Sequence, residues 1–226
     1  MSTDPHFLAF DLRRSGLLYE CGRLRVHALS REPLVLSEGS SCWALVTEGE
    51  AVATLGSDRF SLRAEHYLTA PGPVSIAGGS GLAIVLAEYR SVRQLGGPLE
   101  PSGRLCYVDG CSDTLLVCPP RLGEPCLNHL HIPAQTDQSE HTHPSLRVGV
   151  IARGRGVCRT AAGDVPLTQG LGWLIPAGLR HSFITREQAL DVFAWHPDSD
   201  FGPTDEDHPM INRTLLSQSK KVASTP

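Results

Sequence analysis

Two blocks of histidine, glycine and proline in the C-terminal half constrain this chain more than any other feature. His141 and His143 are separated by one residue. Side chains of a strand alternate with period two, so both histidines point to the same face of an extended segment and can share one metal ion. The second block reads Gly170, five residues, Pro176-Ala177-Gly178, two residues, His181.

The two blocks resemble the signature of the cupin superfamily, in which two motifs fold a small β-barrel around a metal. In the first motif the chain matches the His-x-His pair and the final glycine, Gly154, whereas Gln135 stands at the first glycine and Arg147 at the glutamate. In the second motif only the last position differs, where Thr185 replaces asparagine. The resemblance implies a jelly-roll barrel with three metal ligands: His141, His143 and His181.

An internal repeat is indicated when the chain is slid against itself by 105 residues. Three landmark pairs then coincide: Gly49 with Gly154, Leu62 with Leu167, and Pro71 with Pro176. Self-similarity at a fixed offset predicts two copies of one structural unit. At the positions of the three histidines the first copy has Leu36, Glu38 and Ile76. We therefore expect the first copy to bind no metal.

The expected fold class is all-β, with two tandem cupin barrels (double-stranded β-helix, or jelly-roll) and metal only in the C-terminal one. Short apolar runs alternate with turn signals, and Gly 22 and Pro 17 suit a protein with many turns. We expect a degenerate barrel over residues 1–95, in which residues 1–30 contribute one strand, at 23–28. A Gly/Pro-rich linker is expected at 96–103, where strand pairing cannot continue. The metal-binding barrel is expected at 104–216, and a disordered tail at 217–226.

Composition and charge exclude some classes of partner. The chain of 226 residues has a net charge of −4, so no basic face is expected to attract nucleic acid or an anionic membrane. The N-terminus lacks the pattern of a secretory signal, and no apolar run is long enough to cross a bilayer. We expect a soluble, cytoplasmic protein whose partner is a small-molecule substrate, anionic if an arginine anchors it. The sequence does not decide whether the chain forms a homodimer.

The seven cysteines form no CxxC pair. In a cytoplasmic protein, free thiols usually behave as small buried hydrophobic side chains, and this is the main expectation. A thiolate metal site is the alternative, although structural zinc prefers closer paired spacings.

A second His-x-His pair, His129 and His131, lies on the strand expected at 126–132. One interpretation is a strand face packed on its neighbours with satisfied ring nitrogens. The other makes one of these histidines a substrate-contacting group. The acidic, turn-rich stretch 196–208 is expected to be a long loop of the kind that forms lids or binding sites.

Three histidines without a carboxylate resemble the thiol dioxygenases of the cupin superfamily, which bind Fe(II) in this way. Such enzymes hold the substrate carboxylate with an arginine, and Arg147 is the candidate for that catalytic and substrate-binding role, because guanidinium binds carboxylates in a bidentate manner. An arginine turned outward into a salt bridge at the rim is the alternative. The expected cofactor is one divalent metal per chain, Fe(II), with Zn, Ni, Mn and Cu as alternatives.

Three classes of function follow from these residues. The first is a mononuclear non-haem iron oxygenase on a small polar or carboxylate-bearing substrate. The second is a metal-dependent isomerase, lyase or decarboxylase, in which the metal acts as a Lewis acid. The third is a non-catalytic small-molecule-binding cupin. A transcription factor is disfavoured, because no helix-turn-helix segment accompanies the barrels. Fold alone does not choose between the classes.

Overall fold

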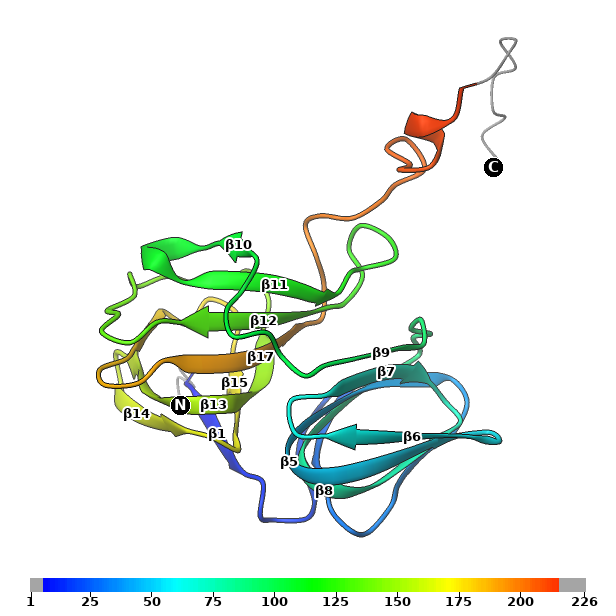
Figure 1. The fold of residues 1–226 in the computed structure, drawn as a ribbon, viewed down its shortest axis with the longest axis horizontal. Helices are drawn as coiled ribbons and strands as arrows, with labels where there is room; N and C mark the ends of the chain where they lie inside the picture. The colour runs from blue at the N-terminus through cyan, green and yellow to red at the C-terminus, as the bar shows by residue number, and fades with distance from the viewer. Residues whose placement is uncertain (1–5, 216–226) are drawn as a thin grey trace.

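The computed structural model describes residues 6–215, whose regular elements are β-strands apart from two short 3₁₀ turns. Figure 1 shows two lobes, and the described residues form one sheet in each. The N-terminal sheet comprises β2 (Gly16–Cys21), β3 (Leu24–Ala28), β4 (Leu34–Leu36), β5 (Ser40–Leu55), β6 (Asp58–Arg63), β7 (Tyr67–Pro71), β8 (Val74–Ala87) and β9 (Gln94–Gly96). The C-terminal sheet comprises β1 (Leu8–Asp11), β10 (Leu105–Cys106), β11 (Ser112–Val117), β12 (Cys126–Ile132), β13 (Arg147–Thr160), β14 (Gly163–Thr168), β15 (Leu171–Ile175), β16 (His181–Ile184) and β17 (Leu190–His196). The all-β fold class is therefore confirmed.

The strands of the two lobes follow the offset that the sequence repeat predicts. β6 begins at Asp58 and β14 at Gly163, and 163 − 58 = 105. The long strands β5 and β13 end at Leu55 and Thr160, and 160 − 55 = 105. Each long strand pairs with the hairpin partner that follows it, β6 or β14.

Each lobe has its own core, and a third cluster lies between the lobes. In β5 every residue from Cys42 to Val46 is buried, because both faces of the strand are covered. Cys42, Ala44 and Val46 belong to the core of the N-terminal lobe, whereas Trp43 and Leu45 belong to the cluster between the lobes. Continuous apolar runs are expected for strands that are buried on both sides.

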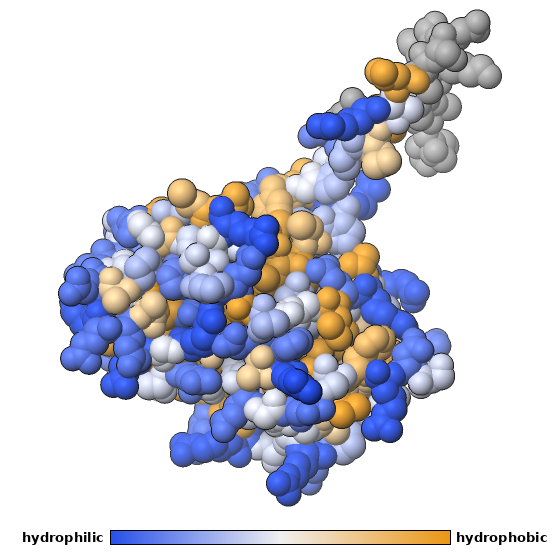
Figure 2. Space-filling model, viewed as in Figure 1, coloured by the Kyte–Doolittle hydropathy of each residue, from blue (hydrophilic) through white to orange (hydrophobic). Residues whose placement is uncertain are grey.

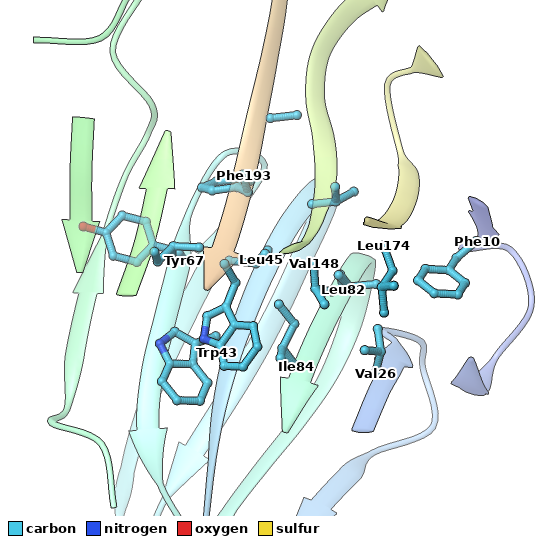
Figure 3. Close-up of a cluster of buried hydrophobic side chains, with 14 of the residues drawn as sticks. Phe10, Val26, Trp43, Leu45, Tyr67, Leu82, Ile84, Val148, Leu174 and Phe193 are labelled. Atoms are coloured by element: carbon cyan, nitrogen blue, oxygen red, sulfur yellow. The ribbon is translucent and has the colours of Figure 1, made fainter. Parts of the chain in front are cut away.

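The cluster between the lobes joins the outer faces of the two sheets (Figure 3). The rings of Trp43 and Trp195 lie 5.3 Å apart, and Tyr67 meets Phe193 edge to face at 6.4 Å. Burying an aromatic or aliphatic side chain of this size contributes about 1.5–3 kcal/mol. Figure 2 shows apolar residues at the surface near the junction of the two lobes, whereas the cluster itself is buried. We infer that the two lobes unfold together.

The first strand changes the expected domain boundaries. β1 pairs antiparallel with β15, with Leu8 opposite Leu174 and Asp11 opposite Leu171, so it completes the C-terminal sheet. The assignment of residues 1–95 to the N-terminal barrel is thus wrong for Leu8–Asp11. Three strands, not one, lie within the first 30 residues. Apolar residues on β1 pack into the cluster between the lobes, which explains why the chain crosses over.

The connector also differs from the expectation. The structure forms β9 at Gln94–Gly96 and pairs it with β7, so strand pairing extends one residue into the predicted linker. The sharp turn comes one residue later, at Gly97 and Pro98, where the glycine has φ +118.

After β17 the chain leaves the C-terminal lobe as an extended arm (Figure 1). Residues 197–210 contain no helix or strand, in agreement with the predicted loop. Asp198 accepts a hydrogen bond from Ser145, and Asp205 pairs with Arg121 at 3.0 Å. The N–H of Leu122 donates to the carbonyl of Pro203 at 3.0 Å, so several contacts hold the arm to the lobe. The predicted tail at 217–226 lies outside the described residues. Over residues 6–215 the only helices are the single turns η1 (Val108–Gly110) and η2 (Ile211–Arg213), and none could span a membrane.

Candidate metal centre

The two histidine blocks meet through backbone hydrogen bonds. His141 and His181 form an isolated antiparallel bridge, with their N–H and C=O groups paired at 3.0 Å in both directions. The N–H of Gly178 donates to the carbonyl of His143 at 2.9 Å. Gly178 has φ +74 at the third position of the turn from Pro176 to Leu179, a conformation that glycine adopts at little cost. The glycine and proline of the second motif therefore place His181 opposite the first motif.

The three side chains gather into one group. Their ring centroids lie 4.5 Å apart for His141 and His181, 5.0 Å for His141 and His143, and 5.1 Å for His143 and His181. One ligand nitrogen from each lies within 4.8 Å of the others. No described carboxylate or cysteine belongs to this group. The arrangement fits a three-imidazole metal site, in which a divalent ion keeps open positions.

The hydrogen bonds of two rings define which nitrogen is free. Nδ1 of His181 lies 3.0 Å from the carbonyl oxygen of Leu179, and Nδ1 of His141 lies 2.9 Å from that of Ser139. A carbonyl can only accept, so both Nδ1 atoms carry the hydrogen and both Nε2 atoms keep a lone pair. Nε2 of His181 is buried without a partner among the described residues. Metal-bound histidines are oriented by such backbone acceptors, so these residues fit a metal.

The electrostatics of the site keep the imidazoles of His143 and His181 neutral. Burial, followed by the charge of Arg147 and the other two histidines, lowers the pKa of His143 to about 3. Burial also lowers the pKa of His181 to about 4, against the raising effect of the Leu179 carbonyl. A neutral imidazole is the form that binds a metal.

Arg147 lies on the lining of a pocket of about 260 Å³ that also contains the three histidines. Its Nη1 donates to the carbonyl oxygens of Ser145 and Leu146, which fixes the guanidinium. Its Nε is buried and has no partner among the described residues. No described ion pair includes Arg147. The structure thus brings this arginine to the site and does not pair it with an acid at the rim.

The histidine pocket is also lined by residues that the sequence motifs did not predict. His196 ends β17, and burial together with Arg147 and His143 lowers its pKa to about 3. The remaining polar or aromatic members of the lining are Tyr107, Asp113, Asn128, Trp173 and Phe183. Cys106 also lines the pocket and is exposed. The remaining free thiols are buried at Cys42, Cys111, Cys126 and Cys158 and exposed at Cys21 and Cys118.

His129 and His131 do not reach this pocket, which corrects their prediction as substrate contacts. They lie on the face of β12 opposite Asn128 and Leu130, which do line the pocket. Both rings contact the same oxygen of Asp191, at 2.8 Å and 2.9 Å. The strand period explains the error: alternation shows that two residues share a face, but not which face.

Asp191 is the centre of a polar network at the edge of the contact between the lobes. Arg153 donates to its second oxygen at 3.0 Å. The same guanidinium reaches Glu65 of the N-terminal lobe at 3.4 Å and the carbonyl of Glu100 at 2.7 Å. Two ring nitrogens and a guanidinium therefore contact this buried carboxylate. Nδ1 of His129 is buried without a partner among the described residues, so the interpretation of a packed strand face with satisfied ring nitrogens holds only in part.

The departures from the cupin motifs have local explanations. Gln135 has φ +60, so the position needs the left-handed conformation for which the motif uses glycine. Thr185 hydrogen-bonds the carbonyl of Pro133 and accepts from the N–H of Thr136, which ties the first motif to β16.

The N-terminal lobe has no equivalent histidine group among the described residues. Of the corresponding positions, Leu36 and Ile76 lie on the paired strands β4 and β8. Glu38 lines an open hollow of about 710 Å³ that has no histidine in its lining. That hollow is larger than the histidine pocket.

No family model and no curated protein matches this sequence. Several solved structures, however, are similar to this chain. A cupin 2 conserved barrel domain protein from Leptotrichia buccalis is 10% identical with a TM-score of 0.60, covering 86% of this chain and 90% of that one. Protein Ylba from E. coli is 16% identical with a TM-score of 0.58, covering 88% and 93%. A mutant of salicylate 1,2-dioxygenase from Pseudoaminobacter salicylatoxidans in complex with gentisate is 12% identical with a TM-score of 0.59, covering 77% and 68%. These likenesses show that the chain has a cupin fold.

Proposed function

We propose that this chain is a mononuclear non-haem metal-dependent oxygenase that holds one Fe(II) and acts on a small polar or carboxylate-bearing substrate. The observation that carries the proposal is the group of three imidazoles, without a carboxylate, on the lining of a small pocket. Neutral imidazole suits iron, and three protein ligands leave positions for other molecules. A salicylate dioxygenase among the similar structures lends support at the level of the fold.

His141, His143 and His181 would hold the metal through nitrogens that face one another. Bound Fe(II) would supply the redox chemistry for reaction with dioxygen, and open positions for it. The protein's own residues would bind and orient the substrate. With no carboxylate among the ligands, the metal and the nearby guanidinium place two positive charges in the pocket, and an anion between them relieves their repulsion.

Arg147 would provide the anchor for that anion. Its Nη1 is already held by two backbone carbonyls, so the edge formed by Nε and Nη2 is the one left for a ligand. This edge matches the two oxygens of a carboxylate. A fixed guanidinium costs little further conformational entropy on binding.

Metal content is the first test. The chain purified without oxygen and reconstituted with Fe(II) should contain one metal per chain by elemental analysis, and His143→Ala should lose most of it while keeping its far-ultraviolet circular dichroism. His208→Ala, in the arm, is the matched control and should keep its metal. Full occupancy in His143→Ala would refute the ligand assignment. Two tightly bound metals would show that a second centre exists.

Oxygen consumption is the second test and separates the classes of function. We expect the Fe(II) form to consume dioxygen with at least one member of a panel of small hydroxy- and amino-carboxylates, and the Zn(II) form not to. Turnover that proceeds with zinc and without dioxygen would assign the chain to the isomerases, lyases or decarboxylases instead. Tight ligand binding without turnover under either condition would favour a non-catalytic binding protein.

A further inference from the structure

The wall of the histidine pocket contains a pair of acceptors that the proposed function does not use. Nδ2 of Asn128 donates to Oδ1 of Asp113 at 2.6 Å, which turns the amide oxygen of Asn128 away from that carboxylate. This Oδ1 of Asn128 is buried and has no partner among the described residues. A buried acceptor without a donor is costly, so a donor from a ligand would stabilise it.

Asp113 is itself a carboxylate without a cation. It takes part in no ion pair within residues 6–215, and its one side-chain partner is the neutral amide of Asn128. Burial raises the pKa of the Asp113 carboxyl, and the Asn128 hydrogen bond only partly offsets this. An ionised carboxylate in such surroundings is stabilised most by a positively charged group.

Arg147 lines the same pocket and carries the opposite charge to Asp113. Its unpaired Nε requires an acceptor, whereas Asp113 and Asn128 require a donor. Tyr107 lies near both: after burial, the charge of Asp113 raises the pKa of its hydroxyl and the charge of Arg147 lowers it. The lining therefore contains one cationic and one anionic side chain beside the three histidines.

The dimensions of the pocket limit which molecules can bridge Arg147 and the Asp113–Asn128 pair. Arg147 begins β13 and Asn128 lies on β12, with β17 between them. Two strand spacings amount to about 10 Å, much of which the arginine side chain spans. The volume of about 260 Å³ lies below the usual range for drug-sized ligands, so the occupant is a small molecule.

We infer that the substrate of this site is a small amino-carboxylate, bound with its carboxylate on Arg147 and its ammonium group at Asp113 and Asn128. The inference rests on the proposed function, because it concerns the molecule held beside the metal. It adds that the substrate carries a positive charge as well as a negative one. A zwitterion leaves neither Arg147 nor Asp113 without a charged partner, whereas a simple anion leaves Asp113 without one.

Binding to the full-length Zn(II)-loaded chain tests this without requiring turnover. The probes are glycine, 3-aminopropanoate, 4-aminobutanoate and 5-aminopentanoate, each compared by calorimetry with its hydroxy and unsubstituted analogues. We expect the best amino acid to bind about tenfold to a hundredfold more tightly than its unsubstituted analogue, the range for a charge-assisted hydrogen bond. Asp113→Asn should remove most of this preference and leave the affinity of the unsubstituted acid and the metal content unchanged.

Arg147→Gln should weaken every carboxylate by about tenfold to a hundredfold, whether or not it carries an amine. Asp205→Asn, in the exposed arm, is the control for the aspartate substitution and should bind like the wild type. If Asp113→Asn does not fold, Asn128→Ala tests the same pair, because it removes the unpaired acceptor.

Two results would overturn the inference. One is an amino acid series that binds no more tightly than its unsubstituted or hydroxy analogues. The other is an amine preference that survives in Asp113→Asn. Failure of the proposed function is a separate result: an Fe(II) form that consumes no dioxygen, with the amine preference intact in the Zn(II) form, would refute the oxygenase and retain the substrate class.

Discussion

Replacing Asp191 by asparagine should uncouple the polar network that joins the two lobes. Asp191 is 5% exposed and accepts hydrogen bonds from His129, His131 and Arg153. Breaking a buried ion pair costs about 3–5 kcal/mol. Because Arg153 would keep Glu65 and the carbonyl of Glu100, we expect Asp191→Asn to lose about 3 kcal/mol of unfolding free energy, the lower end of that range. This is a large share of the 5–15 kcal/mol typical of a folded protein.

The effect should depend on pH in a defined direction. Burial alone raises the pKa of the Asp191 carboxyl, but the hydrogen bonds from the two histidines and Arg153 outweigh burial, and the pKa lies below its ordinary value. A carboxylate with a lower pKa in the folded state stabilises the fold above its unfolded pKa. This contribution is lost as the pH falls through the folded pKa. The difference between wild type and Asp191→Asn should therefore be full at pH 7 and shrink below about pH 4.

Urea unfolding followed by tryptophan fluorescence measures both quantities, because Trp43 and Trp195 lie in the cluster between the lobes. Asp205→Asn is the matched control: it makes the same substitution in an exposed ion pair and should change stability little. A loss in Asp191→Asn no larger than in this control would refute the structural role of the network. So would a difference that stays constant on acidification.

Two further predictions concern backbone positions of the motifs. Gly154→Ala should destabilise far more than Gly123→Ala in thermal unfolding. Both glycines have positive φ, but a Cβ at Gly154 would overlap the carbonyl oxygen of Ala189, whereas Gly123 has open space around it. Equal losses would show that conformation alone matters. Gln135→Gly should raise the unfolding free energy by roughly 0.5–1 kcal/mol. The substitution removes the strain of a non-glycine residue in the left-handed region at φ +60, and the greater chain entropy of glycine in the unfolded state offsets only part of this gain. A loss of stability there would mean that the Gln135 side chain contributes contacts of its own.

The group of three histidines could be predicted because its signal is local. His141 and His143 are two residues apart, and His181 has a fixed distance from the turn at Pro176 and Gly178. Nothing in these spacings depends on how distant strands pair. The structure then adds what the sequence could not contain, which is the orientation of each ring. That orientation depends on the carbonyls of Ser139 and Leu179.

The rest of the pocket depends on strand register between distant segments. Asn128 comes to the site because β12 pairs with β17, where it lies opposite Ala194. His196 comes because β17 pairs with β13. A signal was nevertheless present at β12: if His129 and His131 face one way, Asn128 and Leu130 face the other. The face of β12 that points into the pocket could be identified only once it was known that the second lobe covers the outer face. The crossing of β1 was hidden for the same reason, since its partner lies more than 150 residues away.

The second lobe explains why a site of this kind can be rigid although the N-terminal copy lacks the histidines. The strands that carry the pocket have two buried faces: on β17, Ala194 faces the pocket while Phe193 and Trp195 pack into the cluster between the lobes. On β12, Asn128 faces the pocket while His129 is held by Asp191. Side chains on strands that are fixed from behind lose little freedom when a ligand arrives, and such support is what a precise binding site requires. The N-terminal lobe therefore supports the site by packing against the strand faces that point away from the pocket.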